Sequence, residues 1–547
     1  MNWNECTFSD ALSWAAKEHG PREAVVCGDV RLSYADLHER VMSFAQGLID
    51  AGVQPDEKVA LWMSDRLEWM VARWAVPVIG AILVPINTRF RATDLAYVLR
   101  HSDSATLIMD AGARGVSYPD LLAQLEPGMH GQRAGEWRST AFPMLCRVIV
   151  AAGSLPSASM LDFSEIEGQG RARLQDGERT ALDARMAGVS PDDVAQILYT
   201  SGTTSFPKGA QVRHGPLLQN NYQTVKRMCL TPADRYLSCV PLFSATGTSY
   251  TLSIMLAGAC MVIVDHFDAP SFCSIIERER ITVGFFVDTI VQDLRAYAGL
   301  GDHDLSSLRT GTGAPLSKAS FAFVVEQLGV SELLNVYGMS ETSNAVTRAS
   351  CSDPYEKRAG TNGRPVDGVS VRIVDVDTNE DLGSGRVGEI CISGHSVMKG
   401  YYKQPDEDAK VFDAEGWLHS GDLGELDEDG YLIYRGRVKE MIKPGGFNVA
   451  TQEIEQFLKT YAGVREVAVV GVPDRRLGEV GYAYVECDDG VELSAEALQT
   501  YCRENIASYK VPRYIEFVTE WPLTGSQKIR KLELKKRAAE RVPEEIQ

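Results

Sequence analysis

The stretch YTSGTTSFPKGA, residues 199–210, decides the interpretation of this chain. An apolar run over residues 194–199 leads into it and predicts a buried strand. Small and hydroxyl side chains follow, and the stretch ends in Pro-Lys-Gly around Lys208. Small residues leave backbone N–H groups open to an anion, hydroxyls add donors, and one lysine supplies positive charge. The stretch therefore predicts a loop that holds phosphate.

Two positions separate this loop from a Walker A loop. Pro207 stands where the second glycine belongs, and Lys208 is followed by Gly209 instead of Ser or Thr. A flexible surface turn is the competing interpretation of such a polar stretch. The buried strand before the loop and the Pro-Lys-Gly after it favour phosphate binding over that turn.

Length and charge narrow the class of protein. A chain of 547 residues is too long for one core and predicts two or more domains. The net charge of −19 argues against nucleic acid and anionic membrane as partners, because both need clustered positive charge. Eleven cysteines without a CxxC pair argue against a metal ribbon and a disulfide framework, and they fit a reducing cytoplasm.

Targeting and membrane signals are weak. The N-terminal residues lack the basic and apolar regions of a signal peptide. The longest apolar stretch, Trp69 to Ile86, contains Arg73, Pro77 and Pro85. It therefore predicts a buried helix and strand, and no integral membrane segment is expected.

Strand and helix patterns alternate through much of residues 20–340, which predicts layered α/β structure with parallel strands. Tyr34 to Ala51 has a helical pattern, and Val59 to Trp62 reads as the strand that follows it. Residues 154–190 are rich in small and charged side chains, so we interpret them as a loop-bearing surface excursion.

The pattern changes toward the C-terminus. Residues 366–434 contain short strands with Gly and Asp turns, which predicts a β-rich subdomain. After Arg437 the chain predicts a helix from Thr451 to Tyr461, a strand from Glu466 to Val472 and a helix from Ser494 to Asn505. A tail of this length can fold as a small α+β domain.

The phosphate loop resembles the signature of the adenylate-forming superfamily, which contains acyl-CoA synthetases, luciferases and peptide-synthetase adenylation domains. Further matches extend the resemblance from about residue 10 to residue 535. They are TGTGAP (310–315), YGMSE (337–341), GRP (363–365), GYY (400–402), GWLHSGDLG (416–424), GRVKEMIKPGGFNVATQEIE (436–455) and PLTGSQKIR (522–530). Several motifs in the family's order make chance an implausible explanation.

The resemblance implies an α/β fold with two domains. Residues 1–436 would form a large N-terminal adenylation domain of layered α/β subdomains and the β-rich subdomain, with the ATP and acyl pocket. Residues 437–547 would form a small, mobile α+β C-terminal domain that carries the catalytic lysine, Lys528. Lys439 would be the hinge, and the segment with Lys443, Gly445 and Gly446 would line the channel for coenzyme A.

The resemblance also assigns roles at the nucleotide. Tyr337 would stack on adenine, Ser340 would contact phosphate and Glu341 would hold Mg²⁺, which takes hard oxygen ligands. Asp422 would accept hydrogen bonds from both ribose hydroxyls. The residues implied in ATP and AMP binding are Thr200, Ser201, Gly202, Thr203, Thr204, Lys208, Gly313, Ala314, Pro315, Asn335, Tyr337, Gly338, Asp422 and Arg437.

Each of these motifs, taken alone, also has an interpretation without a role in binding or catalysis. A lone YGMSE would be a helix-capping turn, and a lysine in a basic tail is normally a solvated charge. Lys528 follows the YKVPR segment of residues 509–513, as the family's catalytic lysine does. By that resemblance it would bridge the substrate carboxylate and the α-phosphate and stabilise negative charge in the transition state.

By the same resemblance the acyl pocket is lined by Phe243, Ser244, Gly247, Phe286, Asp288 and Asn344. This mixture of aromatic and polar groups favours a medium-sized, cyclic or aromatic acid, because a long alkyl tunnel would have an apolar lining. Ser244 replaces a family histidine that often gates the pocket, and Asp288 stands where proline is common. At three further positions the chain departs from the family: the family usually has Gly where Ser205 and Gln527 stand, and Thr where Ser340 stands.

The implied activity is the ligation of a carboxylic acid to coenzyme A, with ATP and Mg²⁺. The acid attacks the α-phosphate to give acyl-AMP and pyrophosphate, and the thiol then displaces AMP. Small molecules would be the partners, and a homodimer is left open. An amino-acid adenylation domain is an alternative, although it normally carries Asp at the position of Ser244. A luciferase-like oxygenase shares all the motifs, whereas a non-catalytic relative would be expected to lose Lys528 or Glu341.

Overall fold

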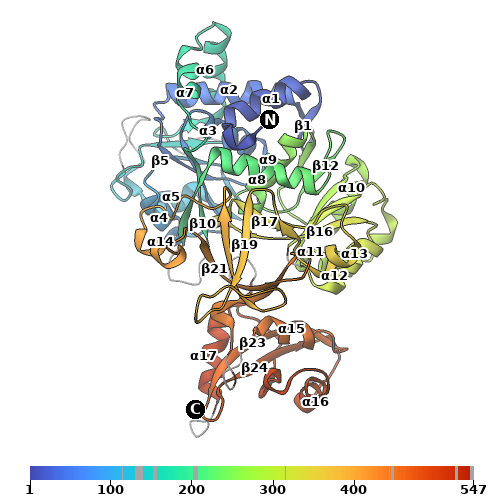
Figure 1. The fold of residues 1–547 in the computed structure, drawn as a ribbon. Helices are drawn as coiled ribbons and strands as arrows, with labels where there is room; N and C mark the ends of the chain where they lie inside the picture. The colour runs from blue at the N-terminus through green and yellow to red at the C-terminus, as the bar shows by residue number, and fades with distance from the viewer. Residues whose placement is uncertain are drawn as a thin grey trace. The chain divides into compact units, whose positions relative to one another are not determined.

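The computed structural model describes residues 1–113, 115–129, 139–151, 157–200, 207–314, 316–442, 444, 449–523 and 528–542. The chain divides into two compact units. Unit 1 contains residues 1–370 and 393–416, and unit 2 contains residues 371–392 and 417–547. Figure 1 shows the layered α/β structure of unit 1, mostly in blue to yellow with α14 in orange, and the elements of unit 2, from yellow at β19 to red at the C-terminus.

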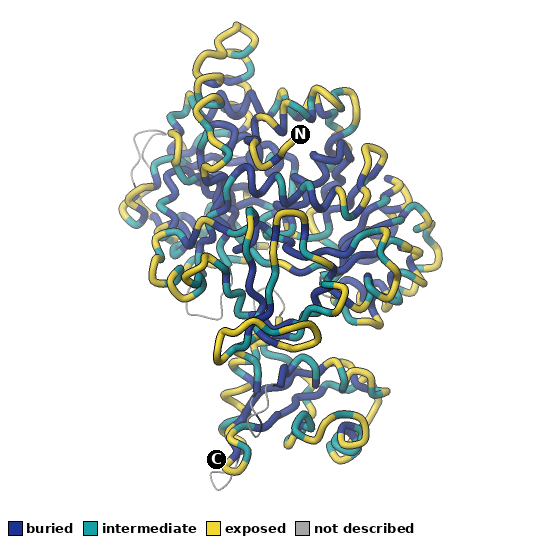
Figure 2. Tube along the Cα trace, in the orientation of Figure 1, coloured by how far each residue is buried: buried dark blue, intermediate teal, exposed yellow. Residues whose placement is uncertain are grey.

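Among the described residues of unit 1, one sheet has seven strands. Most neighbours in it are parallel, and a single antiparallel hairpin closes one edge. Its inner strands are buried on both faces (Figure 2), as expected for parallel strands covered by helices. In spatial order the strands are β11 (Lys208–Arg213), β10 (Val194–Thr200), β4 (Ile82–Pro85), β3 (Lys58–Trp62), β5 (Ser104–Met109), β8 (Arg147–Val150) and β9 (Leu161–Asp162).

A second sheet in the described part of the chain has nine strands. Its central strands are parallel, and antiparallel strands flank them: β17 pairs with β16 on one side, and β2 pairs with β1 on the other. In spatial order the strands are β18 (Arg364–Pro365), β17 (Asn344–Arg348), β16 (Glu332–Met339), β15 (Thr310–Gly313), β14 (Val283–Phe286), β12 (Arg235–Ser238), β13 (Cys260–Ile263), β1 (Glu23–Cys27) and β2 (Val30–Ser33).

Helices alternate with these strands, as the sequence predicts. Capping boxes at Thr7 and Ser33 fix the starts of the first two, because each hydroxyl and the acid three residues later satisfy each other's backbone donors. The helices are α1 (Phe8–His19), α2 (Tyr34–Asp50), α3 (Leu67–Val78), α4 (Ala92–His101), α5 (Tyr118–Leu125), α6 (Phe163–Gln175), α7 (Thr180–Ala187), α8 (His214–Arg227), α9 (Ala245–Ala257), α10 (Ala269–Glu279), α11 (Asp288–Ala296), α12 (Lys318–Glu326), α13 (Tyr355–Gly360) and α14 (Pro405–Val411).

Several predicted elements are confirmed. The helix predicted from Tyr34 is α2, the strand predicted before the phosphate loop is β10, and the apolar stretch from Trp69 is α3 followed by β4. In the described residues no helix is long and apolar enough to cross a membrane.

The interpretation of residues 154–190 as loops is wrong for most of that segment. The segment contains α6 and α7, and α6 packs against α2, where Phe163 stacks on Phe44 with ring centroids 3.9 Å apart. A Cβ on Gly170 would lie 2.0 Å from the Ser43 carbonyl oxygen, so the glycine allows the two helices to approach closely. The small and charged residues that suggested a loop are the closely packed and the solvent-facing sides of a helix.

Unit 2 is built mainly of β-structure, with three helices in its described residues. A four-stranded sheet has the order β19 (Val369–Val374), β20 (Gly388–Gly394), β21 (Leu418–Leu426) and β22 (Leu432–Arg437). The three predicted tail elements are present as α15 (Thr451–Leu458), β23 (Val464–Asp474) and α16 (Ala495–Asn505). Sequence reasoning missed two strands and a helix, which are β24 (Gly478–Cys487), β25 (Tyr514–Phe517) and α17 (Lys531–Arg541).

One disulfide in the described residues links Cys229, just after α8, to Cys351, in the turn after β17. The amide of Cys351 also donates to the Arg227 carbonyl at 2.8 Å. The sequence argued against a disulfide framework, and this isolated link between residues 122 apart was not anticipated.

Candidate active site

The hairpin of β10 and β11 flanks the predicted phosphate loop. Thr200 and Lys208 are opposite each other at its open end, and the Thr200 hydroxyl lies 3.5 Å from the Lys208 carbonyl oxygen, to which it donates. The predicted loop residues Ser201, Gly202, Thr203 and Thr204 lie outside the described residues. The Lys208 ammonium lies 2.5 Å from the Glu407 carboxylate and 4.9 Å from the centre of the Tyr401 ring. Lys208 is therefore held beside the loop by two contacts.

Three neighbouring parallel strands bring their carboxyl ends together. The backbone register aligns Phe286 with Gly313 and Gly313 with Asn335 across β14, β15 and β16. A Cβ on Gly313 would lie 2.7 Å from Asn335 Oδ1, so glycine permits this close approach. Asn335 Oδ1 is buried and accepts no hydrogen bond from any residue that the structure describes. Ala314 continues this edge, its amide donating to the Phe286 carbonyl, while Pro315 lies outside the described residues.

The YGMSE motif spans the end of β16 and the short 3₁₀-helix η4 (Ser340–Thr342). Tyr337 is buried, and Gly338 is required because a Cβ there would lie 1.8 Å from the Asn344 carbonyl oxygen. The Glu341 side chain is also buried, and its Oε1 accepts a 2.8 Å hydrogen bond from the Tyr401 hydroxyl. A buried carboxylate at the carboxyl edge of a parallel sheet is thus held by one specific donor.

In unit 2, Asp422 and Arg437 pair across β21 and β22, with Arg437 Nε 3.4 Å from Asp422 Oδ1. Lys528 lies near both charges on an exposed stretch that follows β25. Partial desolvation by the surrounding protein, followed by the Arg437 guanidinium, lowers the pKa of Lys528, whereas Asp422 and Glu440 act in the opposite direction. Unit 2 by itself therefore brings three of the predicted residues into one electrostatic group.

The remaining predicted residues of unit 2 concern the hinge and the channel. Lys439 lies in the 3₁₀-helix η5 (Val438–Glu440), directly after β22. Lys443, Gly445 and Gly446 lie outside the described residues.

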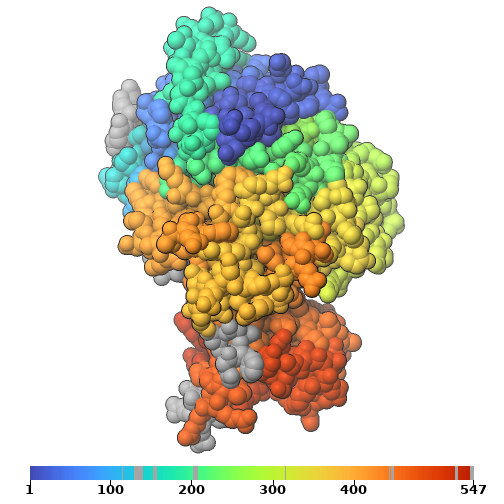
Figure 3. Space-filling model, in the orientation of Figure 1, coloured from blue at the N-terminus to red at the C-terminus, as the bar shows by residue number. Residues whose placement is uncertain are grey.

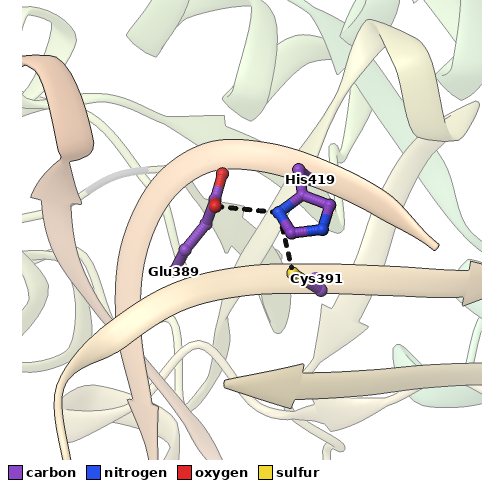
Figure 4. Close-up of side chains that lie close together, drawn as sticks. All are labelled: Glu389, Cys391 and His419. Carbon is purple, nitrogen blue, oxygen red and sulfur yellow. Dashed lines mark hydrogen bonds and ion pairs between the residues drawn. The ribbon is translucent and has the colours of Figure 1, made fainter. Parts of the chain in front are cut away.

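A cluster that the sequence did not reveal supports Asp422. Figure 4 shows Glu389 and Cys391 on β20 facing His419 on β21. The Nδ1 atom of His419 lies 2.9 Å from Glu389 Oε2 and 3.5 Å from Cys391 Sγ, and one potential ligand atom from each residue lies within 4.8 Å of the others. Glu389 also accepts from the Gly421 amide at 2.9 Å. Together these contacts brace the irregular turn of β21 that leads into Asp422.

The residues predicted for the acyl pocket have structural contacts of their own. Ser244 caps α9, accepting from the Gly247 amide at 3.0 Å and donating to the Pro241 carbonyl at 2.7 Å. A Cβ on Gly247 would lie 2.1 Å from that same carbonyl oxygen. Phe243 is half-buried beside this cap. These positions are therefore constrained by the turn before α9 whatever ligand lies there.

The other half of the predicted pocket is similarly constrained. Phe286 is fully buried, and its ring leaves no room for a Cβ on Gly284 or Gly311. The Asp288 carboxylate accepts a 3.0 Å hydrogen bond from the Ser317 hydroxyl and weaker ones from the Ser317 amide, at the start of α12. Asn344 has a φ of 95°, which a non-glycine residue rarely adopts.

A buried polar network behind β15 was missed by sequence reasoning. Thr312 accepts a 2.7 Å hydrogen bond from the Arg348 guanidinium and shares another with the Tyr250 hydroxyl at 2.5 Å. Arg348 is almost fully buried, and burial lowers its pKa. A single arginine in an apolar strand was the signal available in the sequence. Tyr401 and Glu407 were also missed as partners, because they lie 60 or more residues from the groups they contact.

A family model described as AMP-binding enzyme matches residues 12–402, and one described as AMP-binding enzyme C-terminal domain matches residues 453–528. A CoA ligase of Rhodococcus jostii (strain RHA1), named for a propanoate that carries a methyl-dioxo-octahydroindene ring system, is 36% identical over 97% of this chain and 98% of its own length. The human mitochondrial medium-chain acyl-CoA ligase ACSF2 is 30% identical over 97% of this chain and 87% of its own.

A solved structure agrees with these relatives. The crystal structure of the anthranilate CoA ligase AuaEII in complex with anthranoyl-AMP has a TM-score of 0.82 and 25% identity, and the match covers 98% of this chain and 97% of that one. Family models that match most of the chain, and full-length relatives above the level of chance similarity, agree on one assignment. The chain belongs to the AMP-binding enzyme family, in the acyl-CoA synthetase branch of the adenylate-forming superfamily.

Proposed function

We propose that this acyl-CoA synthetase activates a medium-sized carboxylic acid, cyclic or aromatic, in two half-reactions. The acid first attacks the α-phosphate of ATP and releases pyrophosphate, and coenzyme A then displaces AMP from the acyl-adenylate. The observation that carries the proposal is the grouping of Asn335 and Glu341 at the carboxyl end of β16: Asn335 Oδ1, a buried acceptor without a described donor, lies against Gly313, and the buried Glu341 carboxylate follows in η4.

We assign adenine to the carboxyl-terminal half of β16, which contains Asn335 and Tyr337. Asn335 Oδ1 is an acceptor that no described residue satisfies, and the exocyclic amine of adenine is a donor. The buried Tyr337 ring supplies an apolar surface for stacking. In unit 2 we assign the ribose hydroxyls to Asp422, because a carboxylate accepts two hydrogen bonds at once. The adjacent Arg437 guanidinium lies 3.4 Å from that carboxylate and helps to orient it.

The phosphates and a magnesium ion are assigned to unit 1. Lys208 is a cation at the end of the β10–β11 hairpin, and Ser340 supplies a hydroxyl at the start of η4. Glu341 fits Mg²⁺ because it offers a hard oxygen ligand, and the bond from the Tyr401 hydroxyl engages Oε1 and not Oε2. When bound, the ion would neutralise phosphate charge.

Activation is needed because a carboxylate is anionic and its oxygen is a poor leaving group. We assign Lys528 to the first half-reaction, where its ammonium would stabilise negative charge developing between the carboxylate and the α-phosphate. Most of the rate then comes from positioning and charge neutralisation, with no covalent bond between enzyme and substrate.

We further propose that residues 437–547 move as one domain between the two half-reactions, with Lys439 as the hinge. Lys528 and the segment with Lys443 serve different half-reactions in this scheme, so they need different orientations of the domain. Lys439→Pro fixes φ and should trap one orientation, so that one half-reaction survives while the other falls at least about tenfold. Lys439→Ala is the control and should keep both rates. A proline variant with both rates intact would remove Lys439 as the hinge.

The most specific part of the proposal is the chemical class of the carboxylic acid. The Rhodococcus relative is named for a bicyclic propanoate and the solved homologue for anthranilate, and both acids are cyclic. Pyrophosphate release should therefore be measured across aromatic, alicyclic and straight-chain acids of increasing length, followed by thioester formation with coenzyme A. The expected result is highest kcat/KM for a cyclic acid. Preference for long straight chains would contradict the assigned class, and light or oxygen consumption without thioester would contradict the ligase.

A further inference from the structure

Tyr401 contacts two charged groups of the proposed site: Glu341, which we assign to the magnesium ion, and Lys208, which we assign to the phosphates. Its hydroxyl donates to Glu341 Oε1 at 2.8 Å, and its ring lies under the Lys208 ammonium, 4.9 Å from nitrogen to ring centre. Tyr401 and Glu341 are 6% and 7% exposed, so this hydrogen bond is shielded from water. A shielded hydrogen bond to a charged group is stronger than an exposed one.

The segment that carries Tyr401, residues 396–402, is bonded to both neighbouring elements; we call it the bridging segment. On one side the Met398 amide donates to the Glu341 carbonyl at 2.8 Å, and the Ser396 carbonyl accepts from the Ser343 hydroxyl at 2.8 Å. These bonds hold the chain at Glu341 and at Ser343, two residues after it.

On the other side the bridging segment pairs with β11. The Lys399 amide donates to the Gln211 carbonyl, the Gln211 amide to the Gly400 carbonyl, and the Tyr402 amide to the Gly209 carbonyl, at 2.8–3.0 Å. The bridging segment therefore ties the strand that begins at Lys208 to the helical turn that contains Glu341. It leads into α14, which lies on the surface of unit 1 in orange (Figure 3).

Tyr401 is fixed from behind. Its amide donates to the Asp408 carboxylate at 2.7 Å, and Gly400 has a φ of 137° with no room for a Cβ beside that carboxylate. The Tyr401 backbone is therefore held by Asp408, while its hydroxyl and ring are held by Glu341 and Lys208. A fixed donor gives the Glu341 carboxylate one preferred orientation.

We infer that Tyr401 is a positioning residue for the metal ion: its hydroxyl fixes Oε1 of Glu341 and thereby leaves Oε2 directed to the ion. This inference rests on the proposed metal-holding role of Glu341. The aromatic ring contributes separately through Lys208, so Tyr401→Phe removes the hydroxyl and leaves the contact between ring and cation in place.

Tyr402 provides a matched control. It is the next residue of the same bridging segment, and its hydroxyl donates to the Asp103 carboxylate at the same distance, 2.8 Å. Tyr402→Phe therefore removes an equivalent tyrosine–carboxylate bond that does not involve Glu341.

The experiment measures binding of Mn²⁺, as a paramagnetic substitute for Mg²⁺, to the full chain with ATP by electron paramagnetic resonance. Tyr401→Phe should raise the Mn²⁺ dissociation constant about tenfold, as expected for one hydrogen bond to a charged group, and should change the spectrum of the bound ion. Tyr402→Phe should match the parent protein in both. Metal-free AMP binding and the melting temperature should be unaltered in both variants.

The outcomes separate this inference from the function on which it rests. Glu341→Gln with parental Mn²⁺ affinity would overturn the role of Glu341 and the inference with it. Weak Mn²⁺ binding by Glu341→Gln, with parental affinity in Tyr401→Phe, would overturn the inference alone. A Tyr401→Phe variant that also loses AMP binding, or a Tyr402→Phe variant with an equal loss of Mn²⁺ affinity, would assign Tyr401 a packing role and overturn the inference.

Discussion

Lys208 and Lys528 are both assigned to phosphate, yet their surroundings differ. Lys208 begins a strand of a seven-stranded sheet, and its ammonium already has a carboxylate and an aromatic ring as partners. Lys528 lies on an exposed stretch before α17, where desolvation and Arg437 lower its pKa. Lys208 thus lies on a strand with partners for its charge, whereas the surroundings of Lys528 disfavour its charged form.

This difference fits a division of labour. A lysine with permanent partners can hold a phosphate through the whole cycle, exchanging one anion for another. A lysine whose positive charge is only partly balanced by neighbouring anions is stabilised most when a new negative charge develops close to it. Such a lysine stabilises a transition state more than a ground state. Lys208 thus suits binding, and Lys528 suits catalysis.

The largest effect is expected from Lys528→Ala. Adenylate formation should fall about 100- to 1,000-fold, as for loss of one group that stabilises developing charge, while thioester formation from supplied acyl-adenylate is largely kept. Single-turnover assays of each half-reaction measure this split. Lys535→Ala removes an exposed lysine of α17 and should keep both rates. Equal losses in both half-reactions would end the distinction between the two lysines.

A smaller but clear effect is expected from Asp422→Ala. Loss of hydrogen bonds to a charged acceptor should weaken the use of ATP by about 2–3 kcal/mol, or roughly 30- to 150-fold in kcat/KM. Glu425→Ala removes an ion pair with Arg435 between the same two strands and serves as the control. Full titrations with ATP test the prediction, and parental kinetics in Asp422→Ala would remove the ribose role.

The pH dependence sharpens the comparison further. Adenylation by Lys528 needs the ammonium form, and the lowered pKa means that this form is lost at a lower pH than for an ordinary lysine. The rate of adenylate formation should therefore decline on the alkaline side below the usual lysine range, and thioester formation should not follow it. Lys528→Arg keeps its charge and should lose that decline. An unchanged alkaline profile in Lys528→Arg would assign the titration to another group.

The smallest effect concerns Asp288. Its carboxylate accepts from the Ser317 hydroxyl and amide at the start of α12, so Asp288→Ala should lower the free energy of unfolding by about 1 kcal/mol. The ranking of acids should not change. Urea unfolding and the acid panel measure the two properties, and Ser317→Ala should give a similar loss that does not add to the first. A changed ranking would return Asp288 to the acyl pocket.

Local periodicity predicted the elements that local forces decide. The apolar run of β10 and the capped amphipathic pattern of α2 needed no distant information. The helix α6 did need distant information, because the side of α6 that becomes buried can be recognised only from its packing on α2. The family motifs identified Glu341 and Asp422 as site residues. The motifs also contain Tyr401 and His419, but they could not reveal the partners of these residues, because Glu341 and Glu389 lie 60 and 30 residues away in the sequence.

One feature of unit 2 has a consequence for protein engineering. The Lys531 ammonium lies 2.7 Å from Glu440 and 2.8 Å from the buried Glu455, and these carboxylates raise its pKa. Lys531 follows Lys528 by three residues, and Glu440 follows Lys439 directly. A chimera that takes its C-terminal domain from a relative should therefore be joined before Val438. A junction after Glu440 would take Glu440 from one parent and the residues at positions 455 and 531 from the other, and would so divide this ion-pair group.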